Sequence, residues 1–369
     1  MKKQKKNFKT FYENSVFSKG GFYVKISLII LFAVIFLIIF ISQKGYFLFE
    51  YYPYADSFSN SDFQVHFISV GNGDAILIKL PNDKTMMIDT GDDYYSNQVV
   101  SYIKQYFWNE NLNTIDYLVL THPDSDHVGG GAVILDKFKV ENVYRPKIYS
   151  KTEYETLVEK ENYKVYDTEI YDDVITKAYD KNCKIMFNEA GINFQLGGAR
   201  IEFLSPIYDS YSNSNNYSAV IRITYQSKRF LFMGDASKTV ENDLIDIYED
   251  DLKADVLKVG HHGSDTSSSY GFLKRVKPEY AVLSCKSSEY YPSEDVITYL
   301  GYVNSNLLST GIRGSFVMTV ANDKILYADA EKNGGNIPLI FTIFILLVFL
   351  IWENPIKKIK PLINKVKND

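Results

Sequence analysis

The chain has 369 residues, of which 46% are hydrophobic, and a formal net charge of −5. This length and apolar content suffice for one large domain or two ordinary ones and exclude an intrinsically disordered chain. The negative balance excludes a protein that coats nucleic acid through general charge, because such binding draws on counterion release at a basic surface. The two cysteines, Cys183 and Cys285, lack the spacing of a structural zinc site, and we interpret both as structural.

A basic segment and then an apolar segment open the chain. Residues 1–25 contain seven Lys and one Glu, and Ile26 to Ile41 is apolar apart from Ser27. A helix of about 20 residues crosses a bilayer core of ~30 Å. We therefore predict a cytoplasmic tail over 1–25 and a transmembrane helix over 26–43. A cleaved signal peptide is the alternative, which the lack of a clear small-x-small cleavage site disfavours.

The C-terminus repeats this pattern in reverse. Residues 333–352 carry no charge, and residues 353–369 contain five Lys, one Glu and one Asp. We predict a second transmembrane helix and a second cytoplasmic tail, because the basic tail argues against a buried core helix. Basic flanks favour the cytoplasm, so residues 44–332 are expected to form an extracytoplasmic domain of a two-span cell-membrane protein. The whole chain has a net charge of −5, and the two tails carry +6 and +3. The rest of the chain therefore has a net charge of −14.

The predicted external domain begins with alternating strands and continues with strands and helices in turn. Val99, Val100, Ile103 and Phe107 recur at helical spacing, which predicts an amphipathic helix. Strands in runs with interleaved helices indicate an α/β (α+β) fold in which two sheets pack face to face under outer helices. The expected strands are 63–70, 75–80, 85–88, 116–120, 199–204, 217–225, 230–232 and 255–259, and further helices are expected at 237–248 and 267–276.

Residues 147–182 do not follow this pattern of alternating strands and helices. They are rich in Tyr, Glu, Asp and Lys and have little sustained apolar periodicity. We interpret them as a solvated insertion, with a helical lid as the alternative.

The loop after the expected strand at 116–120 concentrates side chains that bind metal ions. It reads Thr-His-Pro-Asp-Ser-Asp-His-Val-Gly-Gly from Thr121 to Gly130. Oxygen-rich clusters with a few imidazoles suit divalent cations such as zinc or manganese, and such ions generate hydroxide from water near neutral pH. A solvated turn is the alternative, since Pro, Asp, Ser and Gly favour turns. The four potential ligands predict a pair of metal ions instead.

Chemistry-bearing residues also follow other expected strands. Gly234 and Asp235 end one strand, the run from Gly260 to Ser264 (Gly-His-His-Gly-Ser) ends another, and Asp89 begins an Asp-Thr-Gly turn. Glycine at a strand end lets backbone and ion approach closely. Four of the five histidines lie in the 121–130 and 260–264 motifs, whereas His66 falls within a strand and is interpreted as structural.

In this order, the motifs resemble the metallo-β-lactamase superfamily, most closely its ComEC-like, competence-type hydrolase domains. Residues 70–75 (Val-Gly-Asn-Gly-Asp-Ala) and 216–218 (Asn-Tyr-Ser) add to the resemblance, which covers about residues 63–327. It implies an αββα sandwich with a site for two divalent ions, Zn or Mn, at one edge between the sheets. The implied ligands are His122 and Asp124 for one ion, Asp126, His127 and one of His261 and His262, with His262 favoured, for the second, and Asp235 as the bridge.

The chain departs from the wider superfamily in ways that bear on the metal. Asp124 stands where the superfamily commonly has His, and Asn216 and Ser218 occupy the region before Gly234 where another His ligand is common. More oxygens and fewer nitrogens shift the preference from zinc towards manganese or leave the first site weakly occupied. Asp89 is expected to orient ligands rather than to bind an ion.

The expected mechanism uses a metal-bound hydroxide that attacks phosphorus or a carbonyl group. Asp126 would orient the nucleophile or receive a proton, His261 would protonate the leaving group, and Ser264 or Asn216 would donate hydrogen bonds to substrate oxygens. The resemblance favours phosphodiesters: either DNA, cut by a nuclease beside a separate DNA-uptake channel, or teichoic-acid and lipid-linked envelope polymers. A non-catalytic, membrane-tethered binding module is the remaining alternative. The sequence leaves the oligomeric state open.

Overall fold

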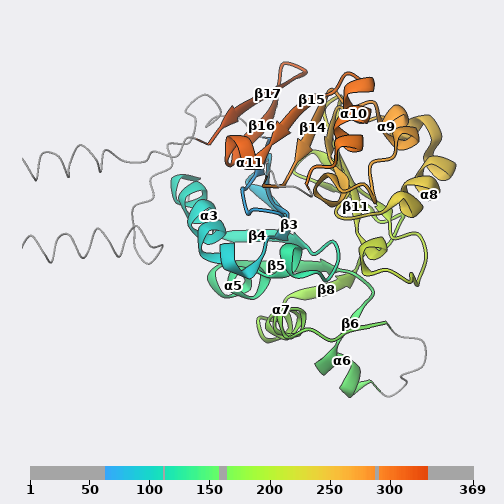
Figure 1. Cartoon of the computed structure of the whole chain (residues 1–369). Coiled ribbons are helices and arrows are strands. Elements are labelled where there is room, and N and C mark those ends of the chain that lie inside the picture. Colours follow the sequence, from blue (N-terminus) through green and yellow to red (C-terminus); the bar gives the residue numbers. More distant parts are fainter. Residues whose placement is uncertain (1–62, 111–112, 158–163, 287–290, 331–369) are drawn as a thin grey trace, which may run out of the picture. The chain divides into compact units, whose positions relative to one another are not determined.

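The protein is described from a computed structural model over residues 63–110, 113–157, 164–286 and 291–330. Within these ranges two large sheets pack face to face, and helices cover the outer face of each (Figure 1). The predicted αββα sandwich is therefore confirmed. The predicted tails and membrane spans at 1–25, 26–43, 333–352 and 353–369 lie outside the described residues. No helix of the described part is long and apolar enough to cross a membrane.

The first sheet has eight strands in the order β17-β16-β1-β2-β3-β4-β5-β8. β3, β4, β5 and β8 pair in parallel, and the other neighbours pair antiparallel. The bounds are β1 (Gln64–Phe67), β2 (Ala75–Leu80), β3 (Lys84–Thr90), β4 (Thr114–Val119), β5 (Lys139–Arg145), β8 (Lys184–Phe187), β16 (Phe316–Ala321) and β17 (Lys324–Asp329).

The second sheet has seven strands in the order β15-β14-β13-β12-β11-β10-β9. β12, β13, β14 and β15 pair in parallel, and β9 to β12 pair antiparallel. The bounds are β9 (Asn193–Leu196), β10 (Ala199–Ser205), β11 (Val220–Tyr225), β12 (Lys228–Phe232), β13 (Val256–Lys258), β14 (Tyr280–Leu283) and β15 (Asn306–Ser309). A small separate sheet pairs β6 (Tyr149–Ser150) with β7 (Val165–Tyr166).

Side-chain alternation along the strands builds the core in layers. In β3, Met86 and Ile88 pack between the sheets, whereas Met87 packs under the helices. β12 repeats this pattern, since Phe232 lies between the sheets and Leu231 lies under the helices of the second sheet. A period of two places alternate residues on opposite faces of a strand, so strands buried on both sides are apolar almost throughout.

Two groups of helices close the outer faces. The helices over the first sheet are α3 (Ser96–Glu110), α4 (Ser125–Val128), α5 (Gly131–Lys137) and α7 (Glu169–Asp180). Those over the second sheet are α8 (Lys238–Tyr248), α9 (Tyr270–Val276) and α10 (Glu294–Tyr302). The shorter elements are α6 (Lys151–Thr156), α11 (Thr310–Arg313), η2 (Asp93–Tyr95), η3 (Ser214–Tyr217), η4 (Glu249–Leu252) and η5 (Gly260–Gly263).

Hydroxyl side chains fix where several of these helices begin. Ser237 caps α8 and Ser269 caps α9, each by accepting a hydrogen bond from a backbone N–H of the first turn. The helix predicted at 267–276 therefore begins later, at Tyr270. Ser268, just before the cap, has a positive φ of 57° and lies outside the helix.

The interpretation of residues 147–182 as a solvated insertion is wrong for its second half. α7 buries Tyr171, Val174, Ile175 and Ala178 against the helical layer of the first sheet. These residues share one helical face, but the polar residues between them hide the pattern when the segment is judged by composition. The helical part of the alternative is correct.

Candidate metal centre

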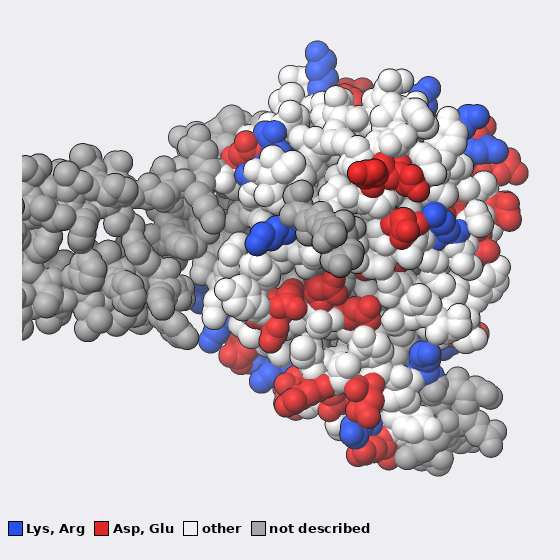
Figure 2. Space-filling view, in the orientation of Figure 1, with Lys and Arg blue, Asp and Glu red and all other residues white. Residues whose placement is uncertain are grey.

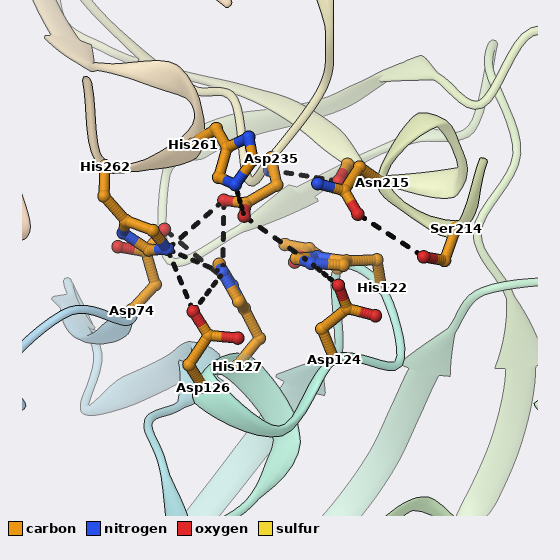
Figure 3. A network of polar contacts seen from close by, with 12 residues as sticks. Asp74, His122, Asp124, Asp126, His127, Ser214, Asn215, Asp235, His261 and His262 are labelled. Atoms are coloured by element: carbon orange, nitrogen blue, oxygen red, sulfur yellow. Dashed lines mark hydrogen bonds and ion pairs between the residues drawn. The ribbon is translucent and has the colours of Figure 1, made fainter. Parts of the chain in front are cut away.

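The predicted motifs meet at one edge of the sandwich. His122 follows β4 in the first sheet, and Asp235 follows β12 in the second. His261 and His262 follow β13, which pairs in parallel with β12, so these three side chains start from neighbouring strand ends. Figure 3 shows the imidazoles and carboxylates pointing towards a common centre. The structure thus brings together all six predicted ligands and His261.

Unusual backbone conformations aim several of these side chains. His261 and His262 have positive φ values of 47° and 53°, and Asp89 has one of 56°. A non-glycine residue in this region is uncommon and often marks a functional site. Gly73 allows the 71–74 turn to approach α4, because a Cβ there would lie 2.4 Å from the backbone oxygen of Asp126.

One group of four donor atoms surrounds one oxygen of Asp235. Asp235 Oδ1 lies 3.1 Å from His127 Nε2 and 3.6 Å from His262 Nε2. The two imidazole nitrogens are 3.2 Å apart, and Asp126 Oδ2 lies 3.2 Å from His262 Nε2 and 3.9 Å from His127 Nε2. We call these four atoms the second donor group.

The other oxygen of Asp235 faces a different set. Asp235 Oδ2 lies 3.8 Å from His122 Nε2 and 3.5 Å from His261 Nε2. Asp124 Oδ2 lies 3.7 Å from His122 Nε2. These four atoms form the first donor group, and Asp235 is the residue that the two groups share.

The distances from the two Asp235 oxygens to the four imidazoles, 3.1–3.8 Å, are near the spacing of ligands on one metal ion. Four ligands at 2.0–2.1 Å around a tetrahedral ion are about 3.3 Å from one another. Two atoms of these groups, His122 Nε2 and Asp235 Oδ1, are buried without a hydrogen bond, although Asp235 Oδ1 lies in ion-pair range of His127; the adjoining Asp74 Oδ1 also lacks a hydrogen bond. A buried polar atom without a partner is costly, and a cation at each group would satisfy His122 Nε2 and Asp235 Oδ1.

The outer atoms of the histidines are held in place, so their Nε2 atoms face the centre. His127 Nδ1 lies 2.8 Å from Asp89 Oδ2, and His262 Nδ1 lies 2.9 Å from the carbonyl oxygen of Ser284. His122 Nδ1 lies 3.0 Å from Thr121 Oγ1. Asp89 also accepts hydrogen bonds from the backbone N–H and the hydroxyl of Thr121. Asp89 therefore orients ligand residues from outside both donor groups.

The charges at the centre depend on one another. Burial opposes the charged form of His127, but Asp235 and Asp89 outweigh it and hold the pKa of His127 well above its ordinary value. Burial also opposes the ionised form of Asp235, yet His127 and His262 hold its pKa well below the ordinary range. His122 differs, because burial and the neighbouring His127 lower its pKa. Without an ion, the centre thus pairs a protonated His127 with an ionised Asp235.

Asp126 and His261 are the two more accessible members of the centre. Burial opposes ionisation of Asp126, but His262 and His127 outweigh it and keep its pKa below the ordinary range. The Asp126 side chain is 34% exposed, so this carboxylate reaches solvent. Burial lowers the pKa of His261, which leaves a neutral imidazole.

The predicted substrate-binding residues make hydrogen bonds within the protein. Ser264 Oγ accepts a hydrogen bond from Thr266 Oγ1 at 3.0 Å, and Thr266 Oγ1 lies 2.9 Å from His261 Nδ1. Asn216, at 7% exposure, accepts a hydrogen bond from the backbone N–H of Ser237 at 3.4 Å. Ser264 is therefore linked to the centre through Thr266 and His261, and Asn216 lies beside the start of α8.

A buried ion pair that sequence reasoning missed adjoins the centre. Asp74 and Lys258 are almost fully buried, with Lys258 Nζ 2.8 Å from Asp74 Oδ2. Asp74 belongs with His127, Asp235 and His262 to a compact group of potential ligands. However, the charge of its carboxylate is neutralised by Lys258. Asp74 Oδ2 lies 4.0 Å from His127 Nδ1, and that nitrogen already contacts Asp89 Oδ2 at 2.8 Å. The one sign of this pair in the sequence is Lys258 itself, a single charged residue within the apolar run 256–259.

A second missed residue comes from the 147–182 segment. Tyr166, on β7, donates a hydrogen bond from its hydroxyl to Asp124 Oδ1 at 2.7 Å. Burial, together with this bond, raises the pKa of Tyr166, so the phenol keeps its proton. The 147–182 segment contains several tyrosines, and its composition does not distinguish Tyr166 from the others.

The sequence of this chain is similar to those of known proteins. Residues 68–287 match the family model described as the metallo-beta-lactamase superfamily. ComE operon protein 3 of Bacillus subtilis is 26% identical over 271 residues, covering 69% of this chain and 33% of that protein. Recombination protein 2 of Haemophilus influenzae is 29% identical over 266 residues, covering 70% of this chain and 29% of that protein. Competence protein ComA of Neisseria gonorrhoeae is 28% identical over 250 residues, covering 66% of this chain and 30% of that protein. The resemblance to competence-type proteins is confirmed, and the chain spans about a third of the length of these relatives.

Proposed function

Because the chain belongs to the metallo-β-lactamase superfamily, we propose that it is a hydrolase that uses two divalent ions to cleave phosphodiesters. The observation that supports this proposal best is the arrangement around the two oxygens of Asp235, since Oδ1 faces His127 and His262 and Oδ2 faces His122 and His261. When bound, the ions would supply a nucleophile from water and stabilise negative charge that develops on the substrate.

The second ion would be held by Asp126, His127, His262 and Asp235 Oδ1. We assign Asp126 rather than Asp74 because Lys258 already neutralises Asp74. The exposed side of Asp126 also places one carboxylate where a water molecule and a substrate can reach it. Since its pKa is low, Asp126 stays ionised and would orient the attacking water by accepting its hydrogen bond.

The first ion would be held by His122, Asp124, His261 and Asp235 Oδ2. Thr266 Oγ1 lies 2.9 Å from His261 Nδ1 and 3.0 Å from Ser264 Oγ, and we assign the His261 tautomer in which Nδ1 donates its proton to Thr266. The neutral imidazole then presents the lone pair of Nε2 towards Asp235. This tautomer suits a ligand better than the general acid that the sequence suggested. His261 thereby replaces the nitrogen that the chain lacks at Asp124, and a mixed nitrogen and oxygen set accepts either zinc or manganese.

The charge of the protein surface bears on the substrate. Figure 2 shows Asp and Glu side chains gathered near the middle of the face in view, with Lys and Arg scattered around it. Burial, with Asp93 and Asp126 nearby, raises the pKa of Asp92, which indicates crowding of negative charge beside the centre. Such a surface repels a long polyanion, so a DNA strand would be gripped through the ions themselves.

Two substrate classes follow from these observations. The relationship to competence proteins favours DNA, cleaved by a nuclease next to a separate uptake channel. The acidic surface favours envelope phosphodiesters, such as teichoic-acid or lipid-linked polymers. In both cases residues 26–43 and 333–352 would anchor the protein in the cell membrane, with residues 44–332 outside and both termini in the cytoplasm.

Hydrolysis of bis(p-nitrophenyl) phosphate by the full-length protein, loaded with Mn²⁺ or Zn²⁺, tests the reaction class. Wild-type protein is expected to hydrolyse it, whereas Asp126→Ala is expected to be inactive because it removes both a ligand of the second ion and the carboxylate that orients the water. Asp136→Ala removes an exposed carboxylate on α5 that pairs with Lys181, and it serves as the matched control. Equal rates for wild type and Asp126→Ala would refute the proposal and favour a non-catalytic binding module. Rates on single-stranded DNA and on polyglycerol phosphate then separate the substrate classes.

A further inference from the structure

Each histidine of the centre has a fixed outer nitrogen, and one carboxylate ligand has an equivalent partner. Thr121, Asp89, Thr266 and Ser284 hold the Nδ1 atoms of His122, His127, His261 and His262, respectively. Tyr166 does the same for Asp124, because its hydroxyl donates to Oδ1 while Oδ2 faces His122. Such partners set the orientation and the basicity of a metal ligand.

The helix that follows Asp124 does not hold this carboxylate. Asp124 occupies the N-cap position of α4, yet its side chain accepts no hydrogen bond from the helix. An Asp side chain that is free to turn can exchange its two oxygens or offer both to one ion. The bond from Tyr166 engages Oδ1 and leaves Oδ2 as the single oxygen that faces the first donor group.

The surrounding segment holds Tyr166 firmly. β7 pairs with β6 through Tyr166 and Ser150. The ring of Tyr166 meets that of Tyr171 edge-on, with centroids 6.0 Å apart and planes at 88°. Tyr171 is fully buried on α7 and donates a hydrogen bond to the carbonyl oxygen of Ile148 at 2.8 Å. Docking of α7 on the first sheet thus determines where the Tyr166 hydroxyl lies.

We infer that Tyr166 is a positioning residue through which the 147–182 segment fixes Asp124 as a one-oxygen ligand of the first ion. The inference rests on the proposed two-ion site. On this inference the segment contributes to the metal centre. The bond from Tyr166 restricts the Asp124 carboxylate, which stands where the superfamily commonly has a more rigid imidazole.

Tyr166→Phe removes only the hydroxyl and keeps the ring that packs on Tyr171. Loss of such a partner typically weakens metal binding 10- to 100-fold. We therefore expect the dissociation constant of the first ion to rise about 10- to 100-fold, with that of the second ion unchanged. Tyr179→Phe is the matched control, because Tyr179 donates a comparable bond to Glu153 Oε1 at 2.9 Å in the same segment but touches none of the ligands.

The test is chelator competition for Zn²⁺ with the full-length protein, which resolves the two dissociation constants, together with the absorption spectrum of the Co²⁺-loaded forms. A selective loss at one site in Tyr166→Phe, with an unchanged melting temperature of the metal-free protein, supports the inference. Unchanged constants, or equal weakening of both ions together with a lower melting temperature, would overturn it while leaving the proposed function intact. If the wild-type protein bound no ion, the proposed function would fail first.

Discussion

The buried pair of Lys258 and Asp74 makes a quantitative prediction about stability. Lys258 is fully buried, with Nζ 2.8 Å from Asp74 Oδ2 and 2.9 Å from the carbonyl oxygen of Val259. Lys258→Met keeps the length of the side chain but leaves the Asp74 carboxylate buried without its cation. Breaking a buried pair in this way costs about 3–5 kcal/mol. For a domain of this size the melting temperature would fall by about 6–20 °C, at roughly 2–4 °C per kcal/mol.

Thermal unfolding of the full-length protein, followed by circular dichroism with a chelator present, measures this cost without a contribution from metal. The matched control is Lys84→Met, because Lys84 forms an equally short pair with Asp116, at 2.6 Å, from a side chain that is 45% exposed. Asp116 is only 9% exposed, but it keeps the hydrogen bonds from Thr85 and its cation reaches solvent, so breaking this pair should cost about 1 kcal/mol. The double variant Lys258→Met with Asp74→Asn should recover part of the loss, since it removes the stranded charge. A Lys258→Met protein as stable as Lys84→Met would refute the reasoning.

Further predictions concern the ligands and the pH. Asp89→Asn should weaken binding of the second ion about 10- to 100-fold in chelator competition, and unchanged affinity would contradict its orienting role. The pKa of His127 is raised, so an ion that binds His127 Nε2 must displace a proton. Below that pKa, the affinity for the ion should therefore rise about tenfold for each unit of increasing pH. Calorimetry in different buffers should show the release of this proton. Burial lowers the pKa of His66 to about 3, so the unfolded chain takes up a proton that the folded chain refuses. Between pH 6 and 4 this residue should lower the unfolding free energy by up to about 1.4 kcal/mol per unit, and urea titrations of His66→Gln should lack that slope.

The residues that meet at the centre could be named from the sequence because their motifs are local and together resemble those of the metallo-β-lactamase superfamily. His122 to His127 form one short motif, and Asp235 and His262 lie beside glycines at the ends of apolar runs. Strand ends deliver side chains to an edge whatever the exact register, which agrees with the single site that the resemblance implied. The sandwich followed from the same alternation of strands and helices.

Residues that act through distant neighbours could not be predicted in this way. Tyr166 reaches Asp124, 42 positions earlier in the chain, only because α7 docks on the first sheet. Asp74 meets Lys258 across the two sheets, and neither residue carries a local sign of the other. The proposed role of His261 depends on its contact with the hydroxyl of Thr266, five positions later, which no motif in the sequence indicates.

The number of ions that the protein binds tests the central claim most directly. Full-length protein would be loaded with Zn²⁺ or Mn²⁺, freed of excess metal by gel filtration and analysed by elemental mass spectrometry. The two donor groups predict about two ions per chain, and Asp235→Asn, which removes the carboxylate that both groups share, should retain neither tightly. A wild-type protein that binds no ion, or an Asp235→Asn protein that keeps two, would contradict the account.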